Sequence, residues 1–371
     1  MDYRIIDAHF HPASSYKPAC IDNARQVFEI MDANGLDRVC MQSVTLWYPW
    51  TLQLNPLLLL MKLMRPGRVY AFGGIRFPKP SESSSPFNYA DQARLLIEAG
   101  FDGIKLFAKP TVRREFGQPI DSPVFDTLYA WLNETGTPVL IHIADPETFW
   151  DAARIPENFR ARGWFYGDGT YSSQQQMFDE TEAVLDRFPD LNLVLPHFYF
   201  HSNALPRLAS LLDRHPRLRL DCTPGIEMYY NFSQNIDAAR AFFLRYQNRI
   251  QFGTDNFGRA LGVELDYLAA AKEIIRYLRD MLENSCATIF GVPQNGLALP
   301  PDVLKKVYAE NFLDYVGGDP KPVDPNYALT FTEETLACAG LAEPARTQLR
   351  LIRAELEHLA ASSTERNDNY A

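Results

Sequence analysis

Two histidines one residue apart, His9 and His11, lie near the start of the chain in the stretch DAHFHP. The apolar pair Ile5-Ile6 precedes this stretch and is typical of a short strand. Because residues i and i+2 of a strand point to the same side, we expect both imidazoles to face one region. Two imidazoles, a third from across a barrel and one carboxylate suit Zn²⁺ or a similar divalent ion. Such an ion lowers the pKa of bound water from about 16 to about 7.

Other residues with the same chemical potential follow further apolar runs, namely Lys105 in GIKLF, His142 in VLIHIAD, His197 in LVLPHF and Asp255 in FGTDN. Each has an ordinary explanation when taken singly. His142 could be a core histidine, Asp255 a helix N-cap and Lys105 a lysine at the exposed end of a strand. The shared position at strand ends favours a common site over four unrelated explanations.

The elements that must position these residues alternate regularly. Apolar runs predict eight strands, at 4–11, 37–44, 69–77, 101–108, 138–145, 191–198, 218–225 and 249–256. Helical patterns follow them at 23–36, 52–67, 90–100, 122–136, 173–190, 205–216, 235–248 and 264–282. Strands buried on both faces indicate a parallel sheet, and eight βα units favour a closed α/β (β/α)8 TIM barrel. No GxGxxG follows the first strand, which weakens the dinucleotide-binding alternative.

We therefore expect a barrel domain over 1–320 and a C-terminal helical extension over 321–371. A closing helix is predicted at 300–317, and two further helices at 332–341 and 345–363. In such barrels the active site lies at the carboxyl ends of the strands, where the histidines and Asp255 fall.

Composition narrows the possible partners. The net charge of −10 and the lack of a basic stripe argue against nucleic acid and anionic membranes, and no apolar run reaches transmembrane length. Five cysteines without a CxxC motif, and no signal-peptide pattern, predict a cytoplasmic protein. We expect a small-molecule substrate. A homodimer could form through the apolar stripe of Leu351, Ile352, Leu356 and Leu359, which could equally fold back on the barrel.

Positive side chains near the predicted site could bind an anionic substrate. Arg76 ends the third strand and, with Lys105 and Lys109, would form a carboxylate anchor. Arg76 could equally pair with a barrel aspartate such as Asp7 or Asp102.

Aromatic residues cluster in three connections on the same face. Trp47 follows the second strand, Trp164 lies in the long connection 145–174 after the fifth strand, and Tyr229 follows the seventh. Some of these rings must pack lids and interfaces. Together they favour an apolar or ring-containing substrate shielded from water.

The order of these motifs closely resembles the metal-dependent amidohydrolase superfamily, and within it the amidohydrolase family 2 branch that includes aminocarboxymuconate semialdehyde decarboxylase. The resemblance covers about residues 4–318. It implies that His9, His11, His142 and Asp255 bind one divalent metal, with zinc favoured and manganese possible. It also implies that His197 lies beside the metal and helps to activate water, and that Asp255 doubles as a proton acceptor.

Two stretches depart from the usual pattern of that family. The sixth-strand motif is PHFYFH, with bulky residues where relatives have small ones. The motif also adds His201, which could reach the substrate or lie in a solvated loop. After the eighth strand the chain reads TDNFGR without the usual proline, so the substrate does not carry over from any relative. In binuclear members a carbamylated strand-four lysine bridges two metals. We favour one metal, with Lys105 either binding an anion or serving a structural role.

These patterns predict a metal-dependent hydrolase in which hydroxide attacks an amide, ester or lactone carbonyl while His197 and Asp255 manage the proton. The alternative enzyme is a non-oxidative decarboxylase of an aromatic or unsaturated carboxylic acid, which the positive Arg76 and Lys105 would favour. A non-catalytic barrel used for binding is a third hypothesis, and it predicts no metal.

Overall fold

The computed structural model describes residues 3–12, 21–44, 51–77, 88–225, 227–257, 266–289, 291–338 and 340–368. Parallel strands form a barrel in the sheet order β8-β7-β6-β5-β4-β3-β2-β1-β9. The strands are β1 (Ile6–His11), β2 (Arg38–Gln42), β3 (Val69–Gly74), β4 (Gly103–Phe107), β5 (Val139–His142), β6 (Leu193–Leu195), β7 (Arg219–Asp221), β8 (Ile250–Gln251) and β9 (Asn256–Phe257). The predicted (β/α)8 barrel is confirmed.

The eighth strand closes the barrel in two pieces. β8 pairs with β7, whereas β9 pairs with β1. Between them the amide of Ala8 donates to the carbonyl of Phe252 at 2.9 Å, and the amide of Asp255 donates to the carbonyl of His9 at 2.8 Å. The predicted continuous strand over 249–256 is therefore interrupted, because Asp255 has a left-handed backbone (φ 53°).

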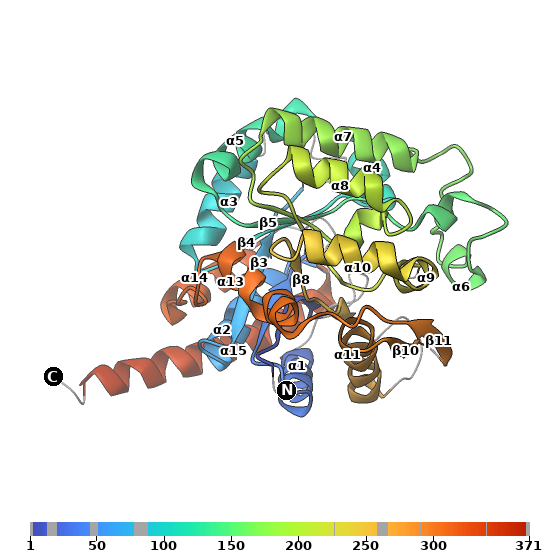
Figure 1. Ribbon diagram of the computed structural model, residues 1–371. Helices are drawn as coiled ribbons and strands as arrows, with labels where there is room; N and C mark the ends of the chain where they lie inside the picture. The colour runs from blue at the N-terminus through green and yellow to red at the C-terminus, as the bar shows by residue number, and fades with distance from the viewer. Residues whose placement is uncertain are drawn as a thin grey trace.

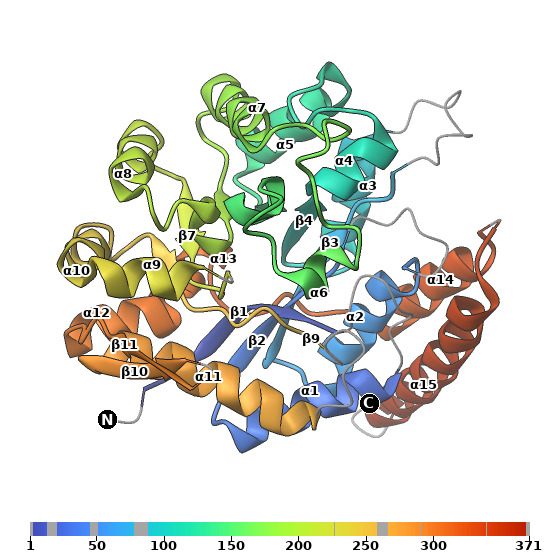
Figure 2. The ribbon, with the colours of Figure 1, turned by 90° about the vertical axis from the view of Figure 1, so that its right-hand side faces the viewer.

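Helices surround the strands, as Figures 1 and 2 show. They are α1 (Ile21–Ala33), α2 (Leu54–Met64), α3 (Tyr89–Glu98), α4 (Pro110–Phe116), α5 (Asp126–Thr135), α6 (Glu157–Arg160), α7 (Gln174–Arg187), α8 (Leu205–Arg214), α9 (Met228–Gln234), α10 (Ile236–Arg245), α11 (Tyr267–Glu283), α12 (Pro301–Lys305), α13 (Asn311–Val316), α14 (Pro325–Leu336) and α15 (Glu343–Asp368). Their apolar faces pack on the outside of the barrel in one large core.

The observed elements differ from the prediction in several places, among them α14 (Pro325–Leu336), where a helix was predicted over 332–341. The helix predicted over 300–317 contains a π-helical turn at Lys306–Glu310 between α12 and α13. The strand predicted to reach 198 stops at Leu195, and residues 286–295, for which no element was predicted, form the hairpin of β10 (Cys286–Ile289) and β11 (Val292–Asn295).

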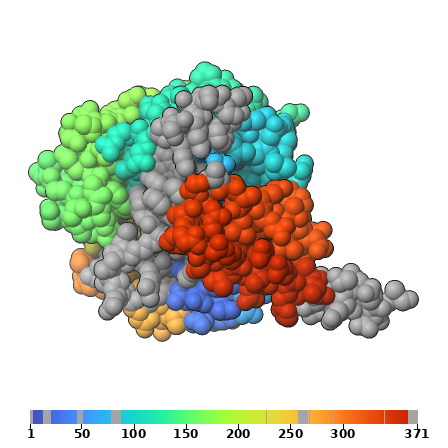
Figure 3. All heavy atoms as spheres, turned by 180° about the vertical axis from the view of Figure 1, so that it is seen from behind, coloured from blue at the N-terminus to red at the C-terminus, as the bar shows by residue number. Residues whose placement is uncertain are grey.

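The C-terminal helices pack against the side of the barrel. α15 contacts α14, α2 and α1, and the red and orange surface in Figure 3 lies beside the blue N-terminal elements. Ile352 and Leu356 of its apolar stripe are fully buried, whereas Leu351 is 46% exposed. The stripe thus folds back on the barrel, and the homodimer stays a prediction. None of the described helices is long and apolar enough to cross a membrane.

Candidate metal centre and adjoining cavity

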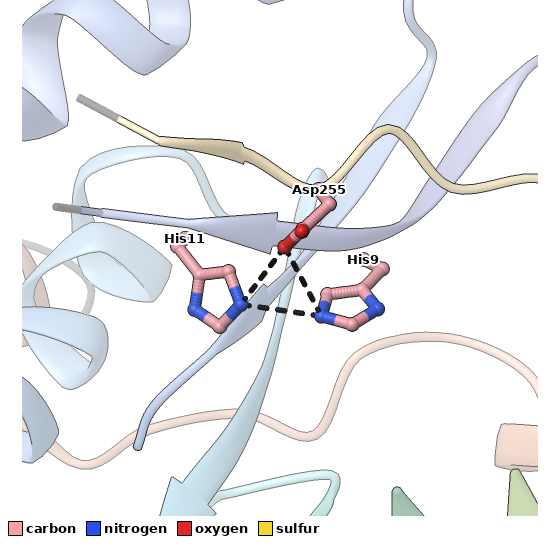
Figure 4. A group of neighbouring side chains, drawn as sticks. All are labelled: His9, His11 and Asp255. Carbon is pink, nitrogen blue, oxygen red and sulfur yellow. Dashed lines mark hydrogen bonds and ion pairs between the residues drawn. The ribbon is translucent and has the colours of Figure 1, made fainter. Parts of the chain in front are cut away.

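His9, His11 and Asp255 meet at the carboxyl ends of the strands (Figure 4). The Nε2 atoms of His9 and His11 lie 3.2 Å apart. The Oδ1 atom of Asp255 lies 3.3 Å from Nε2 of His11 and 3.6 Å from Nε2 of His9. Alternation along β1 places both imidazoles on one side, as the spacing predicts.

The hydrogen bonds at the other ring nitrogens assign the tautomers of both histidines. Nδ1 of His9 lies 2.8 Å from a carboxylate oxygen of Asp221, and Nδ1 of His11 lies 2.8 Å from the carbonyl oxygen of Gln42. Both oxygens only accept, so each Nδ1 carries the proton and each Nε2 holds a lone pair. Two lone pairs and a carboxylate oxygen therefore face one another.

This arrangement fits a divalent cation. Acceptor atoms at such short distances repel one another unless a cation or proton lies between them. Two atoms bound about 2.0–2.1 Å from a tetrahedral zinc ion lie about 3.4 Å apart, which matches the spacing of the three donor atoms. Carbonyl and carboxylate partners on Nδ1 are also what metal-binding histidines normally have. His9, His11 and Asp255 would thus hold the ion.

The glycine of the GTD motif makes this close approach possible. A Cβ on Gly253 would lie 2.7 Å from Cγ2 of Thr223 and 2.9 Å from Cβ of His9, both too short for real contacts. Next to it, Thr254 donates from its amide and its hydroxyl to the buried carboxylate of Asp7. These contacts hold the eighth strand against β1 and so place Asp255 beside both histidines.

His197 lies beside this group on an unusual backbone turn. The residues His197–Phe200 all have left-handed φ angles between 52° and 57°, at a cost of roughly 1–2 kcal/mol per residue for L-amino acids. Phe198 offsets part of this cost by packing on Phe232 and Phe243, with ring centroids 5.0 and 5.2 Å away. The bulky PHFYFH motif thus supplies the packing that keeps His197 in place. Such strained turns cluster at functional sites.

The imidazole of His197 presents Nε2 as a proton acceptor. The hydroxyl of Thr223 donates to Asp221, so its oxygen accepts from Nδ1 of His197, 3.1 Å away. Nε2 of His197 lies 3.3 Å from Nδ1 of His142. His142 therefore lies against His197 at the cavity wall, outside the group of His9, His11 and Asp255 whose ligand atoms all lie within 4.8 Å of one another. Its role as a metal ligand stays a prediction.

Asp221 at the end of β7 is the residue that sequence reasoning missed. One oxygen accepts from Nδ1 of His9, and the other accepts from the amide of His197 at 2.9 Å. It thus connects a candidate metal ligand to the candidate proton acceptor. The available signal was a carboxylate inside the apolar strand predicted over 218–225.

Burial controls the charges of the imidazoles. It lowers the pKa of His197 to about 4 and the pKa of His9 well below its ordinary value. Both rings are therefore neutral at pH 7, as metal binding and proton acceptance require.

A cavity of about 520 Å³ opens beside this group. His11, His142, His197 and Asp255 form one part of its wall. The rest is largely aromatic, with Phe107, Phe149, Phe159, Trp164, Phe200, Tyr229, Tyr230 and Tyr277. Trp164 therefore lines the cavity, as do Phe149 and Phe159 of the same long connection 145–174. Trp47 lies outside the described residues.

The other predicted substrate-binding residues that the structure describes lie outside the cavity wall. Lys105 is buried in the barrel with Nζ 3.3 Å from Nε2 of His9, and burial lowers its pKa to about 8. His201 packs between Phe178 and Tyr199, with Nδ1 2.7 Å from the Tyr199 carbonyl. The backbone of Arg76 exchanges hydrogen bonds with the Gln92 side chain. None of Lys105, His201 and Arg76 is among the described residues of the cavity wall.

The two aspartates considered as partners of Arg76 are paired with other residues. Asp7 accepts from Thr254. Asp102 accepts from Nζ of Lys62 at 2.5 Å.

Two of the solved structures that share this fold are similar over most of their length. The apo form of IDCase from Metarhizium anisopliae is 13% identical with a TM-score of 0.53, and the match covers 85% of this chain and 97% of that one. The 4-oxalomesaconate hydratase LigJ from Rhodopseudomonas palustris is 13% identical with a TM-score of 0.51, covering 84% and 95%. At this identity the likeness concerns the fold alone. No curated protein sequence matches the chain significantly.

The sequence pattern of one family runs through the whole barrel. The profile described as amidohydrolase matches residues 6–311, from the start of β1 into α13, and so includes every residue of the metal centre. The chain therefore belongs to the amidohydrolase family.

Proposed function

We propose that this protein is a metal-dependent hydrolase that cleaves an amide, ester or lactone bond in a small, ring-containing or carboxylate-bearing molecule. The observation that carries the proposal is the convergence of two Nε2 lone pairs and the Asp255 carboxylate, with Asp221 and Gln42 holding the opposite ring nitrogens. A divalent ion bound there, with zinc favoured and manganese possible, would supply water of lowered pKa and polarise a carbonyl.

The residues around this centre have separable tasks. His9, His11 and Asp255 would hold the ion, and His142 is proposed as a further ligand. Nε2 of His197 would accept a proton from water and return it to the leaving group. The aromatic wall would bind the ring and exclude bulk water, which strengthens the electrostatic interactions inside the cavity.

Metal content and turnover test the proposal together. Purified full-length protein should contain close to one equivalent of zinc or manganese, and it should hydrolyse phenyl acetate or open the lactone dihydrocoumarin. H9A and D255A should lose both the metal and the activity. H197Q should keep the metal and lose turnover. Wild-type protein with less than about a tenth of an equivalent of metal after supplementation would contradict the proposal and favour the non-catalytic barrel.

A buried lysine in the cavity wall, Lys109, favours a second candidate function, non-oxidative decarboxylation of an aromatic or unsaturated acid. Placement in the decarboxylase-containing branch of family 2 stays a prediction from the sequence motifs. Release of carbon dioxide from a panel of aromatic acids, with no ¹⁸O from labelled water in the product, would establish this alternative. Incorporation of ¹⁸O into a carboxylate product would establish hydrolysis. A second ion bridged by carbamylated Lys105 is the less favoured form of either site.

A further inference from the structure

The side chain of Thr223, which follows β7, connects His197 to Asp221. Its hydroxyl donates to Oδ1 of Asp221, and its oxygen lies 3.1 Å from Nδ1 of His197. The same oxygen lies 3.2 Å from the backbone amide of His197, which also donates to Oδ1 of Asp221 at 2.9 Å. Thr223 and Asp221 are fully buried. Thr223 therefore contacts both the ring and the left-handed backbone of His197.

Packing holds the Thr223 side chain in this orientation. Its Cγ2 lies only 2.7 Å from the position that a Cβ on Gly253 would occupy, so the methyl group packs closely on that glycine. The amide of Thr223 donates to Oδ1 of Asp221 at 3.2 Å. A β-branched side chain has few χ1 rotamers. With the methyl group against Gly253, the hydroxyl faces Asp221 and His197.

The contact at the other ring nitrogen of His197 does not decide its tautomer. Nε2 lies 3.3 Å from Nδ1 of His142. A histidine nitrogen either donates or accepts, so this contact is compatible with a proton on either ring. The Asp221 carboxylate only accepts, so Thr223 points its hydroxyl proton at Asp221 and offers only lone pairs to Nδ1 of His197. The tautomer of His197 therefore depends on Thr223 and not on His142.

We propose that Thr223 is a positioning residue for His197, which keeps the proton on Nδ1 so that Nε2 accepts the proton of the attacking water. The proposal rests on the proposed function, in which His197 is the proton acceptor. Thr223 is not among the described residues of the cavity wall, so it acts only through His197. The water proton passes to Nε2 while the hydroxyl keeps its own proton on Asp221, so no proton moves through Thr223.

The first test compares T223V, T223S and a matched control in full-length, zinc-loaded protein. Valine has the shape of threonine without the hydroxyl, whereas serine keeps the hydroxyl. With phenyl acetate, T223V should lower kcat by about 10- to 100-fold with little change in KM. T223S should retain most of the wild-type kcat. The control is T332V, because Thr332 on α14 is fully buried and its hydroxyl donates to the Ala328 carbonyl; it should match the wild type.

The second test reads the tautomer without turnover. The ¹⁵N NMR shifts of histidine-labelled protein distinguish protonated from unprotonated ring nitrogens, and the signals of His197 are assigned by their loss in H197Q. In the wild type, Nδ1 of His197 should be protonated and Nε2 unprotonated. In T223V the proton should move wholly or partly to Nε2, where His142 can accept it. T223A also removes the hydroxyl and serves in place of T223V if valine prevents folding.

Two outcomes would overturn the proposal. Nε2 of His197 could carry the proton in the wild type, or T223V and T223A could keep the tautomer and the kcat of the wild type. Either result in an active enzyme would leave the hydrolase function intact. Conversely, a wild type that hydrolyses no ester or amide, but shows the expected shifts and their inversion in T223V, would contradict the proposed function and not the assignment of Thr223.

Discussion

Replacing Asp221 by asparagine should weaken zinc binding although Asp221 is not itself a ligand. Oδ1 of Asp221 accepts from the amide of His197 and from the amide and hydroxyl of Thr223, so an asparagine should keep its oxygen there. Its amide nitrogen then faces Nδ1 of His9, where the carboxylate oxygen now lies at 2.8 Å. Two donors meet, so the proton of His9 moves to Nε2 and occupies the lone pair that the metal needs.

Loss of a partner of this kind typically costs 10- to 100-fold in metal affinity, which corresponds to about 1.4–2.8 kcal/mol. The assay is competition for zinc between the apoprotein and a chromogenic chelator. D255N, which alters a candidate ligand directly, should lose more affinity than D221N. D102N makes the same change in a buried aspartate before β4, paired with Lys62, and should leave zinc affinity unchanged. A folded D221N protein with the zinc affinity of the wild type would refute this account of the tautomers.

Three further predictions concern stability. Burial lowers the pKa of His201 to about 4 from an ordinary value of 6.5, so the unfolded chain binds the proton more tightly than the folded one. The stability that neutral His201 contributes is therefore complete above pH 6.5. It is lost as the pH falls toward 4, by about 3 kcal/mol. In urea unfolding from pH 4 to 7, the free energy of unfolding should depend less on pH in H201Q than in the wild type. An equal pH dependence in both proteins would contradict the lowered pKa of His201. L356A should lower the free energy of unfolding by about 2–5 kcal/mol because Leu356 is fully buried. L351A, at an exposed position, should change it by less than about 0.5 kcal/mol in the same urea experiment. Equal effects of the two substitutions would refute the packing of α15. Zinc at about 100 times its dissociation constant should stabilise the wild type by about 2.7 kcal/mol and raise its melting temperature. H9A should show no such increase in melting temperature. An equal increase in H9A would mean that the metal binds at a site that does not include His9.

Local patterns in the sequence were enough to predict the barrel and the position of the site. The alternation of apolar runs with helical patterns predicted a closed barrel of βα units. The positions of His9, His11, His197 and Asp255 at strand ends predicted that these residues lie on one face of it. These predictions succeed because strand periodicity and the carboxyl-end rule depend on residues close together in the chain. The interrupted eighth strand and the left-handed turn after β6 were not predictable in this way, since long-range packing overrides the local preference for φ below zero.

The sequence by itself thus determined the fold class, the HxH motif and the kind of ion that the residues suit. Only the tertiary structure decided which side chains orient the ligands and which lysine reaches the cavity. Asp221 bonds to His9 across 212 residues of sequence, and no local pattern specifies that contact. Likewise, Lys105 and Lys109 lie four positions apart, yet the end of β4 buries Lys105 against His9 and leaves Lys109 at the cavity wall. Side-chain contacts between distant strands arise from barrel closure, so the identity of the partners appears only once the barrel is formed.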